Sequence, residues 1–269
     1  MNTGFISIGS MGGMLVRAFL REGALAPEHV WAATRSQATL DALAAKFPGI
    51  HIASDSQVAQ ECDLMFLCLG AADTATVLAR IDSALSPGQL LLTTAGAIPL
   101  TRLEERVPCR VAKLIPSITQ EIGAGIALLI YGSRVTPEDR SLLENLLMRI
   151  SEPIAITDSL ALPAIGLASG GPALLAYLLQ SMAEEAVRSN AELSPELARR
   201  LVVETAAATM KLITEANMTI EELILRVAAP GGMTALSIEI LSRYVPQAWQ
   251  SAFQETEQRA NKARDSPVL

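Results

Sequence analysis

The chain has 269 residues, of which 50% are hydrophobic and 4% aromatic, and its formal net charge at pH 7 is −7. That length suits two domains of ordinary size, and the aliphatic content is enough for a substantial core. The acidic balance argues against nucleic acid as a partner, because phosphate binding needs a basic surface that displaces counterions. A small molecule is therefore the expected partner.

Targeting and redox signals point to the cytoplasm. The three cysteines, Cys62, Cys68 and Cys109, show neither CxxC spacing nor an even count, so we expect reduced core residues. No basic segment precedes the first apolar run, and no stretch approaches about 18 uncharged apolar residues. The partial exception, residues 154–179, is interrupted by Asp158, prolines and glycines. These features predict a soluble, cytoplasmic protein that does not bind membranes.

Apolar runs of strand length alternate with segments of helical period in the first part of the chain. The expected strands are residues 4–8, 30–33, 50–53, 64–69, 90–94, 111–115, 126–132 and 153–157. The expected helices are residues 10–22, 36–47, 72–84, 99–106 and 137–150, with a short helical turn after the third strand. This alternation predicts an α/β fold, a Rossmann-like doubly wound parallel sheet with helices on both faces.

Strand-like runs disappear after residue 157. The expected helices of this second part are residues 160–190, 195–216, 219–228, 233–243 and 246–264. We therefore divide the chain into a dinucleotide-binding Rossmann domain, 1–157, and an all-helical substrate and dimerisation domain, 158–269. The apolar faces of these helices are wider than a one-sided helix needs. The helices either bury this surface against another copy, in a homodimer or higher homo-oligomer, or cover one another.

The first strand runs into GFISIGSMGG, residues 4–13, where a Rossmann unit carries its G-x-G-x-x-G turn. Ser7 replaces the first glycine, whereas Gly9 would let a diphosphate approach the backbone at the start of a helix. The alternative is a tight strand-to-helix turn without a ligand. Ser7 fits an altered turn, weakened binding or a lost cofactor. The predicted cofactor contacts here are Ile8, Gly9, Ser10, Met11 and Gly12.

The end of the second strand indicates which dinucleotide is bound. An NAD site usually has Asp or Glu there, to accept from the ribose 2′-hydroxyl. Here Thr34, Arg35 and Ser36 supply a guanidinium and two hydroxyls, and no carboxylate that would repel a 2′-phosphate. NADPH is therefore expected in preference to NADH. The alternative is that Arg35 is a surface charge and Ser36 only a helix N-cap.

Five segments, in this order, resemble the pyrroline-5-carboxylate reductase family over essentially the whole chain. They are the strand with its GSMG turn, TRS, VAKLIPSITQEIGAGIALL, GGPALLAYLLQSMAEEAV and VAAPGGMTALSIEIL. The most specific is APGGMT, residues 229–234, which is similar to the family's S-P-G-G-x-T. The resemblance implies NADPH-dependent reduction of a cyclic imine, 1-pyrroline-5-carboxylate to proline, by a dimer.

The resemblance also implies roles for individual residues. Thr234 would contact the ring nitrogen and act as the catalytic residue, and residues 115–132 would line the nicotinamide and substrate pocket. The alternative for APGGMT is a plain inter-helix turn with Thr234 as a cap. The implied substrate contacts are Pro230, Gly231, Gly232, Met233, Gly171 and Pro172. Further implied cofactor contacts are Leu69, Gly70 and Pro116.

Several positions depart from the family pattern. Ala229 replaces a serine and Met233 a small residue, and such changes can weaken carboxylate binding. MPNTP has become residues 115–119, GSGPA has become 169–173, and a Lys-Pro pair has become Gly70 and Ala71. Similar departures occur in a branch described as a late-competence protein. A non-catalytic or regulatory descendant that keeps the fold and the dimer is the competing function.

The remaining conspicuous residues carry no predicted chemistry. His29 and His51 begin strands and are expected to be structural. Glu184 and Glu185 are adjacent on a helix and point about 100° apart, so they do not converge. No metal site is predicted. Lys113, close to residues 115–132, is expected in a surface or interdomain contact.

Overall fold

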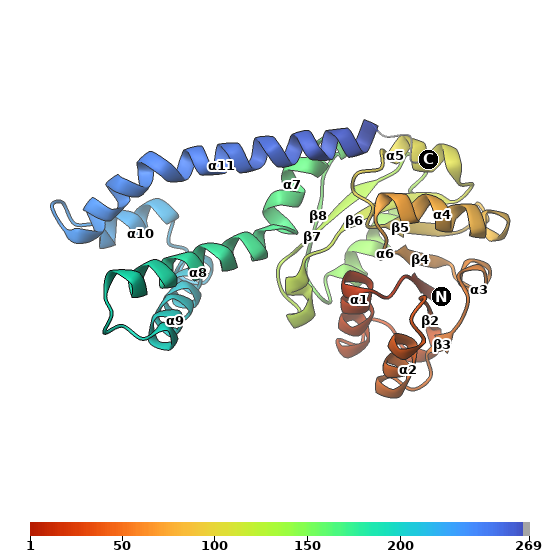
Figure 1. Cartoon of the computed structure of the whole chain (residues 1–269). Coiled ribbons are helices and arrows are strands. Elements are labelled where there is room, and N and C mark those ends of the chain that lie inside the picture. Colours follow the sequence, from red (N-terminus) through yellow and green to blue (C-terminus); the bar gives the residue numbers. More distant parts are fainter. Residues whose placement is uncertain (266–269) are drawn as a thin grey trace. The chain divides into compact units, whose positions relative to one another are not determined.

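The computed structural model describes residues 1–265, which fall into two compact units (Figure 1). The first unit is Met1–Pro172 together with the end of the last helix from Glu257, and the second is Ala173–Thr256. The boundary expected from the sequence, between residues 157 and 158, stays a prediction. Each unit is described separately below.

The first unit contains an eight-stranded sheet with the order β3-β2-β1-β4-β5-β6-β7-β8. The order runs outward in both directions from the β1/β4 pair, which is the doubly wound arrangement expected from the sequence. The strands are β1 (Thr3–Ile6), β2 (Val30–Ala33), β3 (His51–Ile52), β4 (Leu64–Leu67), β5 (Leu90–Thr93), β6 (Arg110–Ile115), β7 (Ile126–Tyr131) and β8 (Glu152–Ala155).

The parallel pairing expected for the first six strands is confirmed, but the sheet as a whole is not wholly parallel. β7 is antiparallel to β6, whereas all other neighbouring strands pair in parallel. The reason is the short connection from β6 to β7, which holds only the 3₁₀ turn η3 (Ile118–Ile122). A parallel crossover needs a dozen or more residues, usually with a helix, whereas a short link joins antiparallel neighbours.

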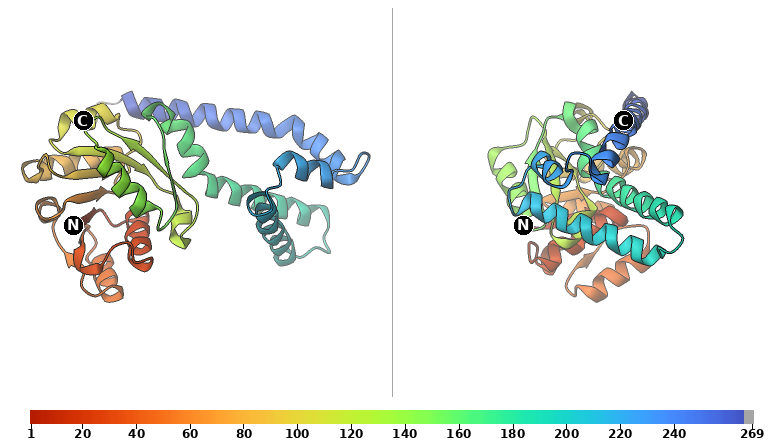
Figure 2. Two further views of the ribbon diagram at one scale, coloured as in Figure 1. Left: turned by 180° about the vertical axis from the view of Figure 1, so that it is seen from behind. Right: turned by 90° about the vertical axis from the view of Figure 1, so that its left-hand side faces the viewer.

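Helices cover both faces of the sheet, as Figures 1 and 2 show. Side chains alternate between the two faces along a strand, so β4 sends Leu64 and Phe66 to one core and Met65 and Leu67 to the other. The first core is closed by α1 (Ser10–Arg21), α2 (Gln37–Lys46) and α6 (Pro137–Leu147). The second is closed by α3 (Asp55–Glu61), α4 (Ala71–Ile81), α5 (Leu100–Arg106) and α7 (Ala161–Ala168).

Two helices of the C-terminal part differ from their expected bounds. The segment 160–190 is two helices, α7 and α8 (Gly171–Ser189), because the amides of Ser169 and Gly170 both bond back to the Ile165 carbonyl and Pro172 then starts a new helix. Conversely, 233–243 and 246–264 form one helix, α11 (Met233–Asp265), with Pro246 inside it. Proline removes one backbone hydrogen bond and often kinks a helix, but here it does not end it.

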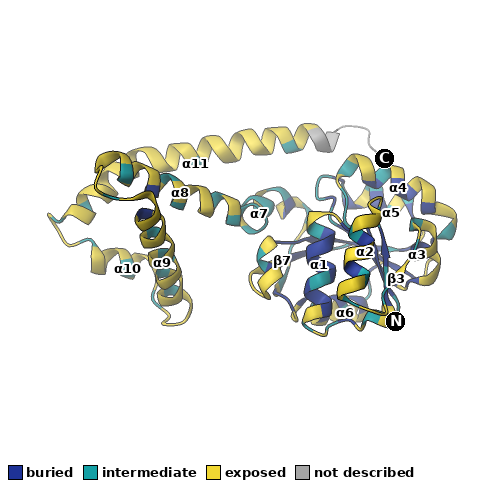
Figure 3. Ribbon diagram, turned by 60° about the horizontal axis from the view of Figure 1, so that its bottom comes forward, coloured by how far each residue is buried: buried dark blue, intermediate teal, exposed yellow. Residues whose placement is uncertain are grey.

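The second unit exposes most of its apolar side chains. Within residues 173–256 the buried hydrophobic residues are Ala183 and Ala198 alone, and Figure 3 shows the surrounding helices largely exposed. The helices besides α8 and α11 are α9 (Pro195–Thr214) and α10 (Ile220–Val227). One stretch, Asp158–Ser189, contains an 18-residue window with a mean hydropathy of 1.6 and could span a membrane by length and composition alone. Neither property distinguishes a membrane span from a helix that packs against protein.

Candidate active site

The turn after β1 has the left-handed step that a dinucleotide-binding turn uses. Ser7 has φ = 70°, in the region that glycine favours, and its amide donates to the Ala33 carbonyl at 2.8 Å. A Cβ at Gly12 would lie 2.4 Å from the Ser7 carbonyl oxygen and 2.9 Å from Cys68 Cβ. Only glycine at position 12 therefore allows α1 to pack this closely on the strand.

Gly9 leaves open the space in which a ligand would approach the backbone. It is the N-cap of α1, without a side-chain cap, and a Cβ there would meet no atom within 4 Å. Ser10 and Met11 begin the helix, where the first N–H groups lack intrahelical acceptors and the dipole favours an anion. Ile8 is buried and contributes its side chain to the core. These features fit a diphosphate and so support the predicted dinucleotide turn.

The segment after β2 contributes two of its three predicted residues to a cleft. Thr34 and Arg35 line the cleft together with Ser7. Ser36 is the N-cap of α2, because its hydroxyl accepts from the Thr39 amide at 3.3 Å, and it does not line the cleft. The N-cap role weighed for Ser36 is therefore present, while Arg35 faces the region where a 2′-phosphate is expected.

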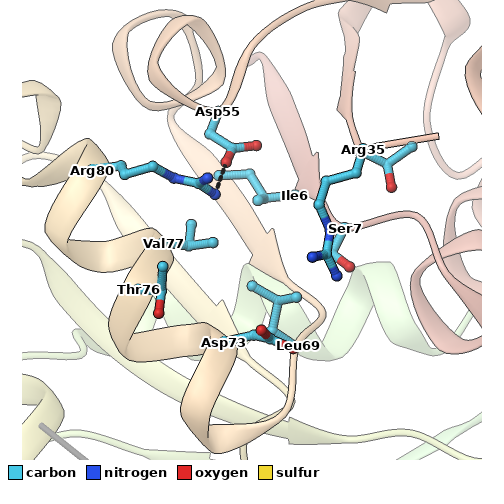
Figure 4. Close-up of a pocket in the computed structure, with 10 residues that line it drawn as sticks. Ile6, Ser7, Arg35, Asp55, Leu69, Asp73, Thr76, Val77 and Arg80 are labelled. Carbon is cyan, nitrogen blue, oxygen red and sulfur yellow. Dashed lines mark hydrogen bonds and ion pairs between the residues drawn. The ribbon is translucent and has the colours of Figure 1, made fainter. Parts of the chain in front are cut away.

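The cleft lies at the carboxyl ends of β1, β2 and β4, where the strand order reverses, and has a volume of about 80 Å³. Figure 4 shows Arg35 extending alongside Ser7, with Asp55 and Arg80 across the cleft from it. The other lining residues are Ile6, Leu69, Asp73, Thr76 and Val77.

The sequence motifs did not reveal the charged residues of α3 and α4 in this cleft. The residues at the end of the second strand predicted a site without carboxylates. In the structure, Asp55 and Asp73 both line the cleft. The spacing of Asp73, Thr76 and Arg80 is i, i+3 and i+7, which places them on one face of a helix and was the available signal. The expected preference for NADPH, which stays a prediction, therefore depends on how these charges are compensated.

The residues that follow β4 lie next to the turn after β1. Leu69 lines the cleft, and Gly70 is the N-cap of α4, with its carbonyl accepting from the Thr74 amide and hydroxyl at 2.9 Å each. Burial raises the pKa of the Cys68 thiol to about 12. Because only a thiolate is a strong nucleophile, Cys68 is a packing residue at neutral pH.

Residues 116–125 form a tightly bonded segment at the end of β6. Pro116 and Ser117 are buried, and Ser117 forms a capping box with Gln120. The Gln120 side-chain amide also donates to Ser151 Oγ at 3.0 Å. Ile122, in contrast, is 80% exposed. The segment is anchored by its own side chains and presents an apolar tip, and Pro116 does not line the cleft.

Lys113 is buried, so its expected surface position is wrong. Its side chain is 1% exposed, and Nζ donates to Asp158 Oδ1 at 2.6 Å. Side chains alternate along β6, so Lys113 faces the second core, where only a carboxylate partner makes its charge tolerable. The contact reaches Asp158, the first residue of the predicted helical domain, which lies in the same compact unit as Lys113, so the interdomain alternative stays a prediction.

The residues of the implied substrate loop form a turn in the second unit. Gly231 has φ = 75°, and the Gly232 amide donates to the Ala229 carbonyl at 2.9 Å before α11 begins at Met233. Pro230, Met233 and Thr234 are exposed, Met233 by 86%. The turn presents amides and one hydroxyl, which suits an anionic substrate. Gly171 and Pro172, at the start of α8, are partly exposed.

No group of three His, Cys, Asp or Glu side chains among residues 1–265 is placed to hold a metal ion. The cleft therefore offers the left-handed backbone of Ser7 and charged side chains as its means of binding, whereas residues 8–12, with the amides at the start of α1, do not line it. This donor set suits a dinucleotide and holds no acid–base dyad.

Both parts of the chain are similar to known protein families. Residues 159–263 match the family model described as pyrroline-5-carboxylate reductase dimerisation. Residues 2–96 match the family model described as NADP oxidoreductase, coenzyme F420-dependent. ComE operon protein 4 of Bacillus subtilis is 28% identical over 257 residues, covering 95% of this chain and 94% of that protein. Pyrroline-5-carboxylate reductase 3 of the same organism is 28% identical over 254 residues, covering 94% and 93%.

A solved structure has the same fold. The pyrroline carboxylate reductase of Plasmodium falciparum with NADP bound superimposes with a TM-score of 0.83 at 19% identity, over 98% of this chain and 97% of that chain. The predicted fold class, a Rossmann-like sheet followed by a helical dimerisation domain, and the predicted family resemblance are confirmed.

Proposed function

We propose, since the chain resembles pyrroline-5-carboxylate reductases over almost its whole length, that it is an NADPH-dependent reductase of a cyclic imine, 1-pyrroline-5-carboxylate in the first instance. The observation that carries the proposal is the turn of Ser7, Gly9 and Gly12, which combines a left-handed step, an open backbone and a close helix contact. Reduced NADP fits this turn with its diphosphate at the start of α1.

The chemistry needs little from the protein side chains. When bound, reduced nicotinamide would supply a hydride for the imine carbon, and a proton on nitrogen would complete the amine. An imine nitrogen is commonly protonated in solution, so no general acid is required. The protein binds and orients the substrate. We assign Thr234 as the hydrogen-bond partner of the ring nitrogen and the Gly231 amide to the substrate carboxylate, because the Gly232 amide already donates to the Ala229 carbonyl.

We assign the remaining predicted residues to the same scheme. Ser10, Met11 and Gly12 provide the amides at the diphosphate, while Thr34 and Arg35 hold the 2′-phosphate. Ser36 takes part through its position at the start of α2. The protein acts in the cytoplasm as a homodimer or higher homo-oligomer, and the apolar stretch Asp158–Ser189 packs against protein rather than lipid, because it overlaps the dimerisation match.

A non-catalytic or regulatory descendant is the second candidate. Ser7, Ala229 and Met233 favour it, because the first glycine and the serine of the substrate turn are both lost. ComE operon protein 4, a relative over almost the whole chain, bears a name that states no reductase activity. This candidate keeps the fold and the oligomer.

Ligand binding and turnover separate the two candidates. Thermal stability is measured with NADPH and NADH up to millimolar concentration, because a ligand stabilises by RT ln(1 + [L]/Kd). Oxidation of NADPH is then followed with 1-pyrroline-5-carboxylate and related cyclic imines. We expect stabilisation and turnover. No thermal shift with either cofactor would sink the reductase proposal, and binding without reduction of any imine would favour the non-catalytic candidate.

A further inference from the structure

One ion pair in the cleft joins two charged residues that lie outside the five segments on which the family resemblance rests. Arg80 Nη2 lies 2.6 Å from Asp55 Oδ2, and both side chains line the cleft (Figure 4). Asp55 is the first residue of α3, and Arg80 lies in the last turn of α4. The Asp55 side chain is 23% exposed and that of Arg80 54%. The pair is therefore exposed enough to solvent to exchange partners, and its position in the cleft lets it interact with a bound ligand.

The charges of the cleft balance only because Arg80 is present. Arg35 and Arg80 supply two positive charges, and Asp55 and Asp73 supply two negative ones. A carboxylate at the adenosine ribose accepts from a 2′-hydroxyl and repels a 2′-phosphate, which favours NADH. Asp55 lines the same cleft as Arg35, and its ion pair with Arg80 occupies and neutralises its carboxylate.

We propose that Arg80 is a specificity-determining residue of the cofactor site, which preserves tolerance of the 2′-phosphate by holding Asp55 in an ion pair. This rests on the proposed function, because it concerns the same cofactor. Arg35 meets the 2′-phosphate directly, whereas Arg80 acts on it through Asp55. The effect of replacing Arg80 on the NADPH-to-NADH affinity ratio should therefore disappear when Asp55 is also replaced, whereas the effect of replacing Arg35 should remain.

The test compares Arg80→Gln, Asp55→Asn and the double variant in the full-length chain by isothermal titration with NADPH and NADH. We expect Arg80→Gln to lower the NADPH-to-NADH affinity ratio about tenfold, since a carboxylate in the cleft that would hold the phosphate is left uncompensated. The double variant should restore the ratio to within about twofold of the wild type, because the repelling carboxylate is then gone.

A matched control uses a second ion pair. Arg106 Nη1 lies 2.8 Å from Asp82 Oδ1, and neither residue lines the cleft. Arg106→Gln removes the same charge by the same substitution and should leave the ratio unchanged. Thermal unfolding without ligand checks the fold, and exposed ion pairs contribute little to it.

The outcomes distinguish this inference from the proposed function. If the wild type binds neither NADPH nor NADH, the proposed function fails and the inference falls with it. If the wild type binds NADPH but Arg80→Gln leaves the ratio unchanged, only the inference is overturned. A double variant that stays as poor as Arg80→Gln also overturns it, because Arg80 would then contact the phosphate directly.

Discussion

The two compact units bury their apolar side chains to very different degrees. In the first, Phe5, Phe19 and Phe66 are at most 1% exposed, and the Phe5 and Phe66 rings stack at 4.8 Å. In the second, between residues 173 and 256, the buried hydrophobic residues are two alanines. A single chain therefore completes the core of the sheet, whereas the helices need a further surface to cover them.

This difference divides the candidate site as well. The cofactor turn takes its geometry from strands and helices within one buried unit, so one chain fixes it. The turn of Ala229 to Thr234 belongs to the unit without a core, and its side chains are exposed. We therefore expect cofactor binding to survive changes that abolish assembly, and imine reduction to depend on them.

The largest effect is expected from charges on the apolar face of α8. Leu175, Leu178 and Met182 are spaced i, i+3 and i+7 and are 60%, 41% and 64% exposed. If a dimer covers this face, Leu178→Asp with Met182→Asp removes four apolar side chains from its interface, about 6–12 kcal/mol at 1.5–3 kcal/mol each. Sedimentation should show a monomer. This monomer should not reduce the imine but should still bind NADPH.

The matched control is Met148→Asp in the first unit. Met148 is 58% exposed but stands outside the dimerisation match, so the same change of charge should leave the sedimented mass unaltered. An unchanged mass for the α8 variant as well would contradict the oligomer and would mean that the helices of one chain cover one another.

The next largest effect concerns the two glycines of the cofactor turn. Gly12→Ala places a Cβ 2.4 Å from the Ser7 carbonyl oxygen, so backbone must shift, and overpacking of this kind costs about 1–3 kcal/mol or more. Gly9→Ala meets no atom within 4 Å. Urea unfolding should therefore show a lower free energy of unfolding for Gly12→Ala only. Titration should show a lower NADPH affinity for both variants. An unaltered NADPH affinity in Gly9→Ala would contradict the placement of the diphosphate.

Arg35→Ala tests the cofactor half of the comparison without touching the core. A charge-assisted contact to the 2′-phosphate contributes roughly 1.5–3 kcal/mol, so NADPH affinity should fall about ten- to a hundredfold and NADH affinity much less. The two affinities are compared by titration. Equal losses for both cofactors would show that Arg35 acts on the fold.

Thr234→Ala tests the other half. A hydroxyl that bonds the reacting nitrogen contributes about 1–3 kcal/mol, so kcat/KM for the imine should fall about ten- to a hundredfold with NADPH affinity nearly unchanged. Steady-state kinetics measures the first quantity and titration the second. Full activity in this variant would mean that Thr234 is only a helix cap. Ala229→Ser should separately improve binding of a carboxylated substrate.

The sequence predicted the layers of the first unit well, because uninterrupted apolar runs such as Leu64–Leu67 leave little choice between buried strand and loop. It did not predict the direction of β7, which depends on the length of a connection, or the continuity of α11 across Pro246, which depends on packing along a long helix. The local pattern of apolar residues indicates neither the direction of a strand nor the continuity of a helix across a proline.

The same distinction explains which site residues were found. Gly9, Gly12 and Arg35 stand at fixed offsets from strand ends, so a motif reveals them. Asp55 and Arg80 come from α3 and α4 and reach the cleft only when the sheet has been assembled in the order β3-β2-β1-β4. Their pairing is a tertiary contact across 25 residues, and no offset from the glycines indicates it.

The smallest effect concerns Ser7, where the first unit departs most from the family pattern. A non-glycine residue in the left-handed region costs about 1–2 kcal/mol, and glycine relieves this strain while adding freedom to the unfolded chain. Ser7→Gly should therefore raise the free energy of unfolding by about 0.5–1 kcal/mol in a urea titration. The backbone already has φ = 70°, so the amides at the diphosphate stay in place and NADPH affinity should change less than about threefold. A gain of tenfold or more would show that the serine side chain obstructs the cofactor, and would turn Ser7 into support for the non-catalytic candidate.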